Sequence, residues 1–142
     1  MVHVFISYKR TTANRRLVER MSERLRNAGF EVWVDTKKLR AGQDWREEID
    51  QAIRESLALI VILTPEAVTS QYVTYEWAFA MGVGIPVIPI LREQTELHPR
   101  LVGLHYLDFT VGDNHPWEDL IERLQETKGE ESPPLEIYEL DW

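Results

Sequence analysis

Leu57-Ala-Leu-Ile-Val-Ile-Leu63 is the stretch that decides the fold of this 142-residue chain. All seven side chains are apolar, and Thr64-Pro65 follows directly. A continuous apolar run of this length is typical of a strand that is buried on both faces. Such a strand belongs to a parallel sheet with helices on each side. The remainder of the chain therefore has to supply further strands and two layers of helices.

Four other stretches predict strands of the same sheet. They are residues 2–7, 30–34, 85–91 and 104–109. Pro86 and Pro89 interrupt the third of these stretches. Because each proline removes a backbone donor, we expect residues 85–91 to lie toward an edge of the sheet or to be partly irregular.

Amphipathic helices are predicted between the strands. Apolar residues recur at helical spacing in residues 12–28, 45–53, 72–81 and 117–124. Thr11 or Thr12 can cap the first helix, and Gly29 ends it. Alternating strands and helices require right-handed crossovers. We therefore predict an α/β protein with a flavodoxin-like, doubly wound sheet of about five parallel strands in the order 2-1-3-4-5, with helices on both faces.

The domain is predicted to cover residues 1–128. Residues 129–142 begin Gly-Glu-Glu-Ser-Pro-Pro and are expected to form a C-terminal tail or the start of a linker to a further domain. The absence of cysteine excludes disulfides, thiolate metal sites and a cysteine nucleophile. The N-terminus is unlike a signal peptide, and no apolar run approaches the roughly 18–20 residues that span a bilayer. We expect a cytoplasmic protein without a membrane partner.

The net charge of −8 is unevenly distributed. Residues 1–60 hold 12 Lys/Arg and 9 Asp/Glu, which gives +3, whereas residues 61–142 hold 4 and 15, which gives −11. An acidic chain disfavours nonspecific nucleic-acid binding. A basic half and an acidic half suit head-to-tail self-association. Surface charge that varies without a function explains the same numbers, and the sequence leaves both interpretations open.

Several standard sites are absent from the sequence. No Gly-x-Gly-x-x-Gly follows the first strand, and there is no Walker A motif. The four histidines are scattered, so we expect no metal site. A phospho-receiver domain would need acidic residues after the first strand and an aspartate after the third. This chain has Ser7-Tyr-Lys-Arg10 and Leu63-Thr-Pro65 at those places, which excludes the receiver function.

One carboxylate lies at the predicted switch point of the sheet. Glu76 falls early in the predicted helix 72–81, and the loop after the first strand is expected to bring Tyr8, Lys9 and Arg10 into the same cleft. A glutamate early in a helix is also favoured by the helix dipole alone, so a structural role stays open. Lys9 and Arg10 can equally be solvated loop charges.

A single carboxylate beside cations and aromatic side chains suits one class of reaction. Ordinary glycoside hydrolysis uses two carboxylates, because a poor leaving group must be protonated. The nicotinamide–ribose bond already carries a cationic leaving group, so no general acid is needed. One carboxylate then stabilises the oxocarbenium charge of the transition state. Aromatic faces can stack on the bases, and Lys9 or Arg10 can bind the pyrophosphate.

Four ordered motifs resemble the Toll/interleukin receptor/resistance (TIR) domain family over roughly residues 1–125. They are Phe5-Ile-Ser-Tyr8, Gly29-Phe-Glu-Val-Trp-Val-Asp35, Leu39-Arg-Ala-Gly-Gln43 and the run from Ser70 to Trp77. The resemblance implies an NAD+ glycohydrolase or cyclase of the bacterial NAD-cleaving type. Such an enzyme gives nicotinamide and ADP-ribose or a cyclic ADP-ribose isomer in immune signalling or defence. NAD+ is then a substrate, and no cofactor is expected.

The resemblance also implies roles for individual residues. Ser70 and Glu76 fall on the Ser-x-x-x-x-x-Glu run of the family, with Glu76 catalytic, and Tyr72 stands where an aromatic, often Trp, is common. Ser70 and Tyr72 are expected to bind the substrate, with Tyr72 stacking on a base. The other substrate-binding residues expected are Tyr8, Lys9, Arg10 and Asp35, with Trp45 as a stacking residue or, from its apolar stripe, a core residue. The loop of residues 36–44 corresponds to the gating loop through which TIR domains associate. A non-catalytic TIR scaffold acting by homotypic assembly is the alternative.

Overall fold

Five strands form one parallel sheet in the computed structural model, which describes residues 2–34, 46–112 and 114–129. The strands are β1 His3–Ser7, β2 Glu31–Val34, β3 Ser56–Leu63, β4 Val87–Leu91 and β5 Leu107–Asp108. Their order in the sheet is β2-β1-β3-β4-β5, and every pairing is parallel. The predicted sheet order and the predicted parallel pairing are confirmed.

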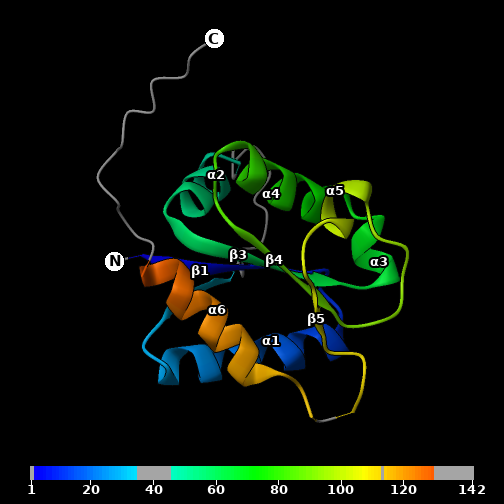
Figure 1. Cartoon of the computed structure of the whole chain (residues 1–142). Coiled ribbons are helices and arrows are strands. Elements are labelled where there is room, and N and C mark those ends of the chain that lie inside the picture. Colours follow the sequence, from blue (N-terminus) through cyan, green and yellow to red (C-terminus); the bar gives the residue numbers. More distant parts are fainter. Residues whose placement is uncertain (1, 35–45, 113, 130–142) are drawn as a thin grey trace, which may run out of the picture.

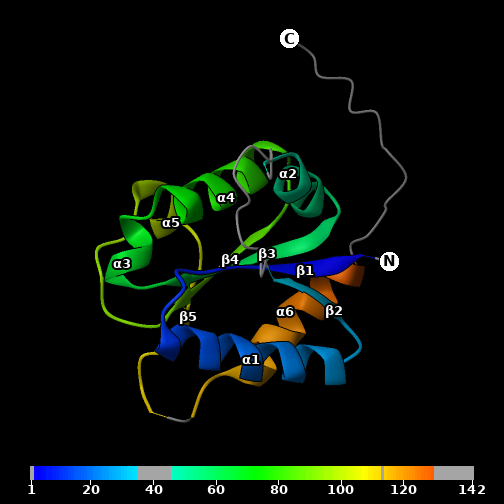
Figure 2. The same cartoon turned by 180° about the vertical axis from the view of Figure 1, so that it is seen from behind.

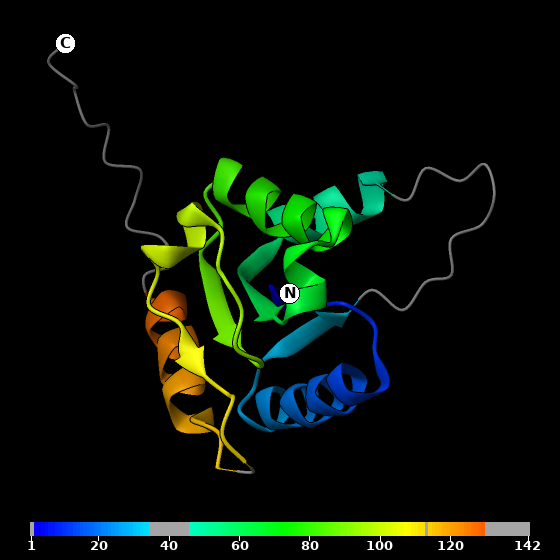
Figure 3. The ribbon, with the colours of Figure 1, turned by 90° about the vertical axis from the view of Figure 1, so that its right-hand side faces the viewer.

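Two layers of helices enclose the sheet. The helices are α1 Thr12–Asn27, α2 Arg46–Arg54, α3 Pro65–Val68, α4 Gln71–Gly82, α5 Pro99–Val102 and α6 Trp117–Gly129. Figure 1 shows α1 and α6 on one face of the sheet and α2, α3, α4 and α5 on the other. The view from behind in Figure 2 and the side view in Figure 3 show the same two layers. The predicted helices on both faces are confirmed.

The central strand β3 explains why both faces are covered. All eight of its residues are buried. Because side chains alternate along a strand, Ile60 and Ile62 pack with α1 and α6, whereas Leu59 and Val61 pack with α2 and α4. The continuous apolar run thus serves two cores at once, one on each face of the sheet.

The proline-containing strand β4 lies inside the sheet, next to the edge strand β5. Pro86 precedes the strand, and its carbonyl accepts a hydrogen bond from the Leu59 N–H at 2.9 Å. Pro89 pairs with β3, but β5 pairs with β4 only from Ile90 onward. At Pro89 the strand therefore has one neighbour, which is the situation in which a proline is tolerated in a sheet.

Two short helices, α3 and α5, lie outside the four helices that the sequence predicts. α3 begins with Pro65, and the Thr64 side chain accepts a hydrogen bond from the Ala67 N–H at 3.1 Å. α5 begins in the same way with Pro99 after the capping residue His98. A capping residue followed by proline is a helix start as well as a strand stop. The predicted strand 104–109 is correspondingly shorter, and only Leu107–Asp108 pairs.

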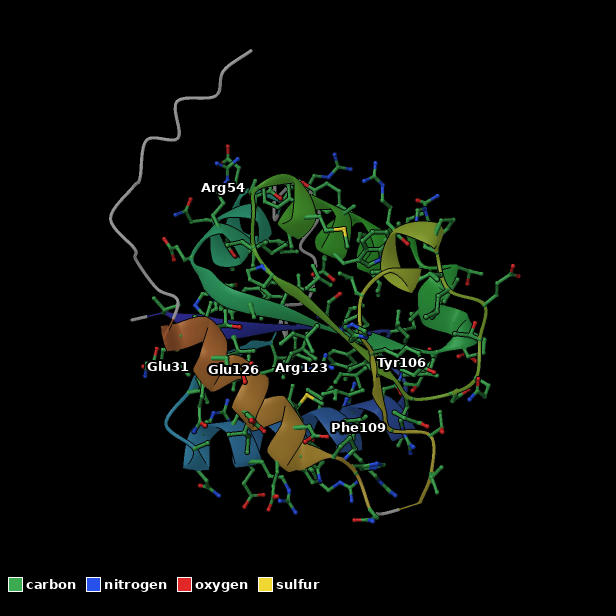
Figure 4. All side chains as sticks on the ribbon, viewed as in Figure 1. Glu31, Arg54, Tyr106, Phe109, Arg123 and Glu126 are labelled. Carbon is green, nitrogen blue, oxygen red and sulfur yellow. The ribbon has the colours of Figure 1, made fainter. Side chains whose placement is uncertain are left out.

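α6 closes the face of the sheet that α1 shares. The Arg123 guanidinium donates a hydrogen bond to the His105 carbonyl, and Phe109 contacts the Trp117 ring edge-on at a centroid distance of 5.1 Å. Figure 4 labels Arg123 on α6 and Phe109 on the segment beside it. Within the described residues, no helix has the length and apolarity needed to cross a membrane. Of the expected tail 129–142, only Gly129 lies among the described residues, as the last residue of α6.

Candidate active site at the carboxyl ends of β1 and β3

Glu76 lies on the face of α4 that packs against the sheet. Its buried neighbours on the helix are Val73, Trp77 and Ala80, at the i, i+3, i+4 and i+7 spacing of a core-facing stripe. Glu76 is only 9% exposed. The first turn of α4 contains no acidic residue, so Glu76 sits beyond the turn in which the helix dipole favours a carboxylate. The dipole alone therefore does not account for this glutamate.

Ser7, the last residue of β1, holds the Glu76 carboxylate. Its hydroxyl donates a hydrogen bond to Glu76 Oε1 at 2.8 Å, and Ser7 is 1% exposed. Phe5, two residues earlier, belongs to the core on the α4 side of the sheet. Because the side chains of a strand alternate, Ser7 points to the same side. A buried carboxylate is costly unless it is hydrogen-bonded, and Ser7 supplies a donor.

Ser7 is absent from the site residues named in the sequence analysis. The alternation of side chains along the first strand does indicate that Ser7 shares a face with Phe5, whereas Ile6 and Tyr8 share the other face. The sequence does not indicate on which of these two faces α4 packs. The contact joins residues that are 69 positions apart.

Ser70 is the N-cap of α4. Its hydroxyl accepts a hydrogen bond from the Val73 N–H at 3.3 Å, and the side chain is buried. The cap fixes where the helix begins. The structure thus assigns Ser70 a local structural contact, six residues before Glu76 in the sequence.

Tyr8 and Arg10 lie along α1. Tyr8 packs against the core between the sheet and α1. Together with Arg10 it lines a groove of about 570 Å³ whose other described residues are Arg15, Val18, Glu19, Ser22, Arg26 and Val34. This lining includes neither Ser7 nor Glu76. Lys9 is exposed, and its carbonyl accepts a hydrogen bond from Asn14 Nδ2 at 2.9 Å.

Two tyrosines flank Glu76 on the outer side of α4. Tyr72, one turn earlier, is 56% exposed, so a large part of its ring faces solvent. Tyr75 donates a hydrogen bond from its hydroxyl to Asp50 Oδ1 at 2.6 Å and stacks on Phe79 at a centroid distance of 5.8 Å. The hydrogen bond to Asp50 raises the pKa of Tyr75. It also ties α2 to α4 beside the site.

The other expected site residues cannot be placed. Asp35, Trp45 and the loop of residues 36–44 lie outside the described residues. Trp77 shares the buried stripe of α4 with Glu76 and is a core residue at 5% exposure. Among the residues that the structure describes, no group of three or more His, Asp or Glu side chains could hold a metal ion.

The family resemblance and the sheet order agree with comparison to known proteins. The sequence profile of the TIR domain family matches residues 4–125, and the chain belongs to this family. A curated relative, the 2′ cyclic ADP-D-ribose synthase BtTIR of Bacteroides thetaiotaomicron, is 30% identical over 118 residues. That alignment covers 77% of this chain, which spans only 40% of the relative's length.

Solved TIR domains share the fold. The TIR domain of the Toll-related receptor TRR-2 from Hydra magnipapillata superposes with a TM-score of 0.72 at 24% identity, over 88% of this chain and 99% of the receptor domain. The RPS4 and RRS1 TIR domain heterodimer gives a TM-score of 0.54 at 15% identity, over 91% of this chain and 97% of the matched chain. At these identities the structures establish the fold, and the second shows that TIR domains of this fold associate with one another.

Proposed function

We propose that this domain is an NAD+ nucleosidase, a hydrolase or cyclase acting on the N-glycosidic bond between nicotinamide and ribose. The products are nicotinamide and either ADP-ribose or a cyclic ADP-ribose isomer. One observation carries the proposal: a buried carboxylate, Glu76, occupies a core-facing position at the carboxyl ends of β1 and β3 and is hydrogen-bonded there. These two strands flank the switch point of the sheet, where ligands bind in open α/β folds.

The chemistry follows from the leaving group. Nicotinamide leaves the ribose as a neutral molecule, so the bond breaks without a general acid and leaves positive charge on the ribosyl carbon and ring oxygen. Glu76 stabilises that charge as it develops. Water then attacks the ribosyl carbon and gives ADP-ribose, or an oxygen or nitrogen of the ADP-ribosyl group itself attacks and gives a cyclic product. The exposed ring of Tyr72 offers a stacking face one helical turn away.

The named relative supports the choice of substrate. BtTIR is called a 2′ cyclic ADP-D-ribose synthase. Cyclic ADP-ribose contains the atoms of NAD+ that remain when nicotinamide has left, so NAD+ is the substrate from which it forms. We extend this substrate to the present chain, together with a cytoplasmic role in immune signalling or defence. The associating TIR domains among the solved structures support a further element of the proposal, namely that copies of this domain assemble to become active.

Nicotinamide release tests the proposal directly. Concentrated protein is incubated with NAD+, with and without a crowding agent, and nicotinamide is followed by liquid chromatography. We expect turnover by the wild type and a loss of at least about 100-fold in Glu76→Gln, which keeps the shape and removes the charge. Glu66→Gln, an exposed glutamate on α3, is the matched control and should retain full activity.

Two results would contradict the proposed enzymatic function. Equal turnover in wild type and Glu76→Gln would show that Glu76 does not take part in the reaction. Absence of turnover in every condition, while the chain pairs with other TIR domains in pull-down or cross-linking experiments, would favour the non-catalytic scaffold.

A further inference from the structure

The Glu76 carboxylate accepts a hydrogen bond from the first strand, β1. The Ser7 hydroxyl reaches Glu76 Oε1 at 2.8 Å, and both side chains are buried. The terminal torsion of a glutamate is broad, because rotation about an sp³–sp² bond has no sharp staggered wells. A donor that binds one oxygen therefore restricts the plane of the whole carboxylate.

The strand that carries this donor is itself rigid. β1 is paired on both sides, with β2 and with β3, and Ser7 pairs with Val61 in the centre of the sheet. Its neighbour on the same face, Phe5, stacks on Trp33 at a centroid distance of 4.7 Å. Ser7 thus presents its hydroxyl from the end of a strand inside the sheet, whereas the Glu76 carboxylate is carried on a longer side chain.

We propose that Ser7 is a positioning residue for Glu76: its hydroxyl holds the carboxylate in the orientation that faces the developing ribosyl charge. This inference rests on the proposed function of the site. A carboxylate that is free to rotate stabilises the transition state less than one that is already oriented. The entropy lost when it becomes oriented then adds to the activation free energy. The effect should fall on the chemical step and leave ground-state binding of NAD+ almost unchanged.

Steady-state kinetics with three serine variants tests the proposal. We expect Ser7→Ala to lower kcat by about tenfold or more while KM for NAD+ changes by less than about twofold. Ser7→Thr keeps a hydroxyl at the same place and should recover most of kcat. The matched control is Ser56→Ala, another buried strand serine, whose hydroxyl donates to the Ala52 carbonyl at the opposite end of β3. It should leave both constants as in the wild type.

A double-mutant cycle tests the contact without using activity. The free energies of unfolding of wild type, Ser7→Ala, Glu76→Leu and the double variant are measured in urea, because leucine removes the acceptor of the Ser7 hydrogen bond. Coupled residues give effects that do not add, whereas independent residues give additive effects. Additive effects would overturn the contact, and unchanged kcat in Ser7→Ala would overturn the positioning role even if the residues are coupled.

The kinetic and thermodynamic results also separate this inference from the proposed function. A wild type that cleaves NAD+, is inactivated by Glu76→Gln and is unaffected by Ser7→Ala retains the function and rejects the role of Ser7. A wild type without turnover rejects the function itself, and coupling in the cycle then identifies the pair as a structural contact only.

Discussion

A buried glutamate on the core-facing stripe of α4 conflicts with the pattern of its own helix. Val73, Trp77 and Ala80 on the same stripe are apolar, and an aliphatic residue at position 76 would complete it. Burying a carboxylate costs free energy that even a good hydrogen bond only partly offsets. A local choice that opposes packing in this way is typical of a functional position. The Ser7–Glu76 pair is one place where this domain departs from an optimally stable core.

Replacing both members of the pair tests that interpretation. We expect the free energy of unfolding of Ser7→Ala/Glu76→Leu to equal that of the wild type or to exceed it by up to about 2 kcal/mol. The reason is that a buried polar pair is exchanged for apolar groups of similar size. The double variant should be inactive. Urea denaturation gives the stability, with Glu76→Leu alone as the control, which leaves the Ser7 hydroxyl buried without its acceptor. A double variant clearly less stable than the wild type would contradict the prediction.

At the scale of elements, α4 and β1 position the site through their ends. α4 begins at the cap Ser70, and β1 ends at Ser7, directly under the second turn of the helix. The hydrogen bond between Tyr75 and Asp50 fixes α2 against α4 from the outer side. The sequence analysis attributes substrate binding to Ser70, whereas the described structure gives it a capping hydrogen bond.

Substitution of the cap distinguishes the two roles of Ser70. Ser70→Ala should lower the free energy of unfolding by about 1 kcal/mol, because the Val73 N–H loses its acceptor. Ser70→Asp keeps a capping oxygen and should restore most of that stability. We expect KM for NAD+ to be similar in both variants when the protein is assayed well below its unfolding temperature. A large rise in KM in the stable Ser70→Asp variant would favour direct substrate binding.

At the scale of the whole molecule, the two oppositely charged halves of the sequence are not two separate poles. The arginine-rich α1 and the acidic helix α6 lie side by side on one face of the sheet (Figure 1, Figure 2). The Arg24 guanidinium lies 5.0 Å from the centre of the Trp117 ring, which joins the two helices. The basic and the acidic helix therefore share one face of the sheet and do not form opposite ends of the molecule.

The remaining arginines of α1 still give a prediction for self-association. Exposed Arg16 and Arg20 lie on α1 outside the groove that contains Tyr8. If assembly uses this basic surface, it should weaken as salt rises, because the screening length falls from about 10 Å at 0.1 M to about 3 Å at 1 M. Arg20→Glu should weaken it at low salt, whereas Arg100→Glu, the same change on α5, should not. Sedimentation velocity measures the oligomer, and independence from salt would contradict an electrostatic contact.

The sequence by itself determined the sheet order, the two helix layers and the location of Glu76 near the switch point. The strands and helices follow from the spacing of apolar residues over short segments, as in the run from Leu57 to Leu63, and that spacing is visible in a single chain. The sheet order follows from the alternation of strands and helices and the right-handed crossovers between them. Capping by Thr64-Pro65 was equally local, but the same residues also end a strand, so α3 was missed.

Only the tertiary structure decided what touches Glu76. Glu76 faces the core and accepts the Ser7 hydrogen bond because α4 docks on a strand whose contact residue is 69 positions away in the sequence. Tyr8 lies on the other side of the sheet, in the groove along α1. A shift of one residue in strand position would exchange Ser7 for Tyr8 on the α4 side, because neighbouring side chains of a strand point to opposite faces. That choice is made by packing across the sheet, which no local pattern records.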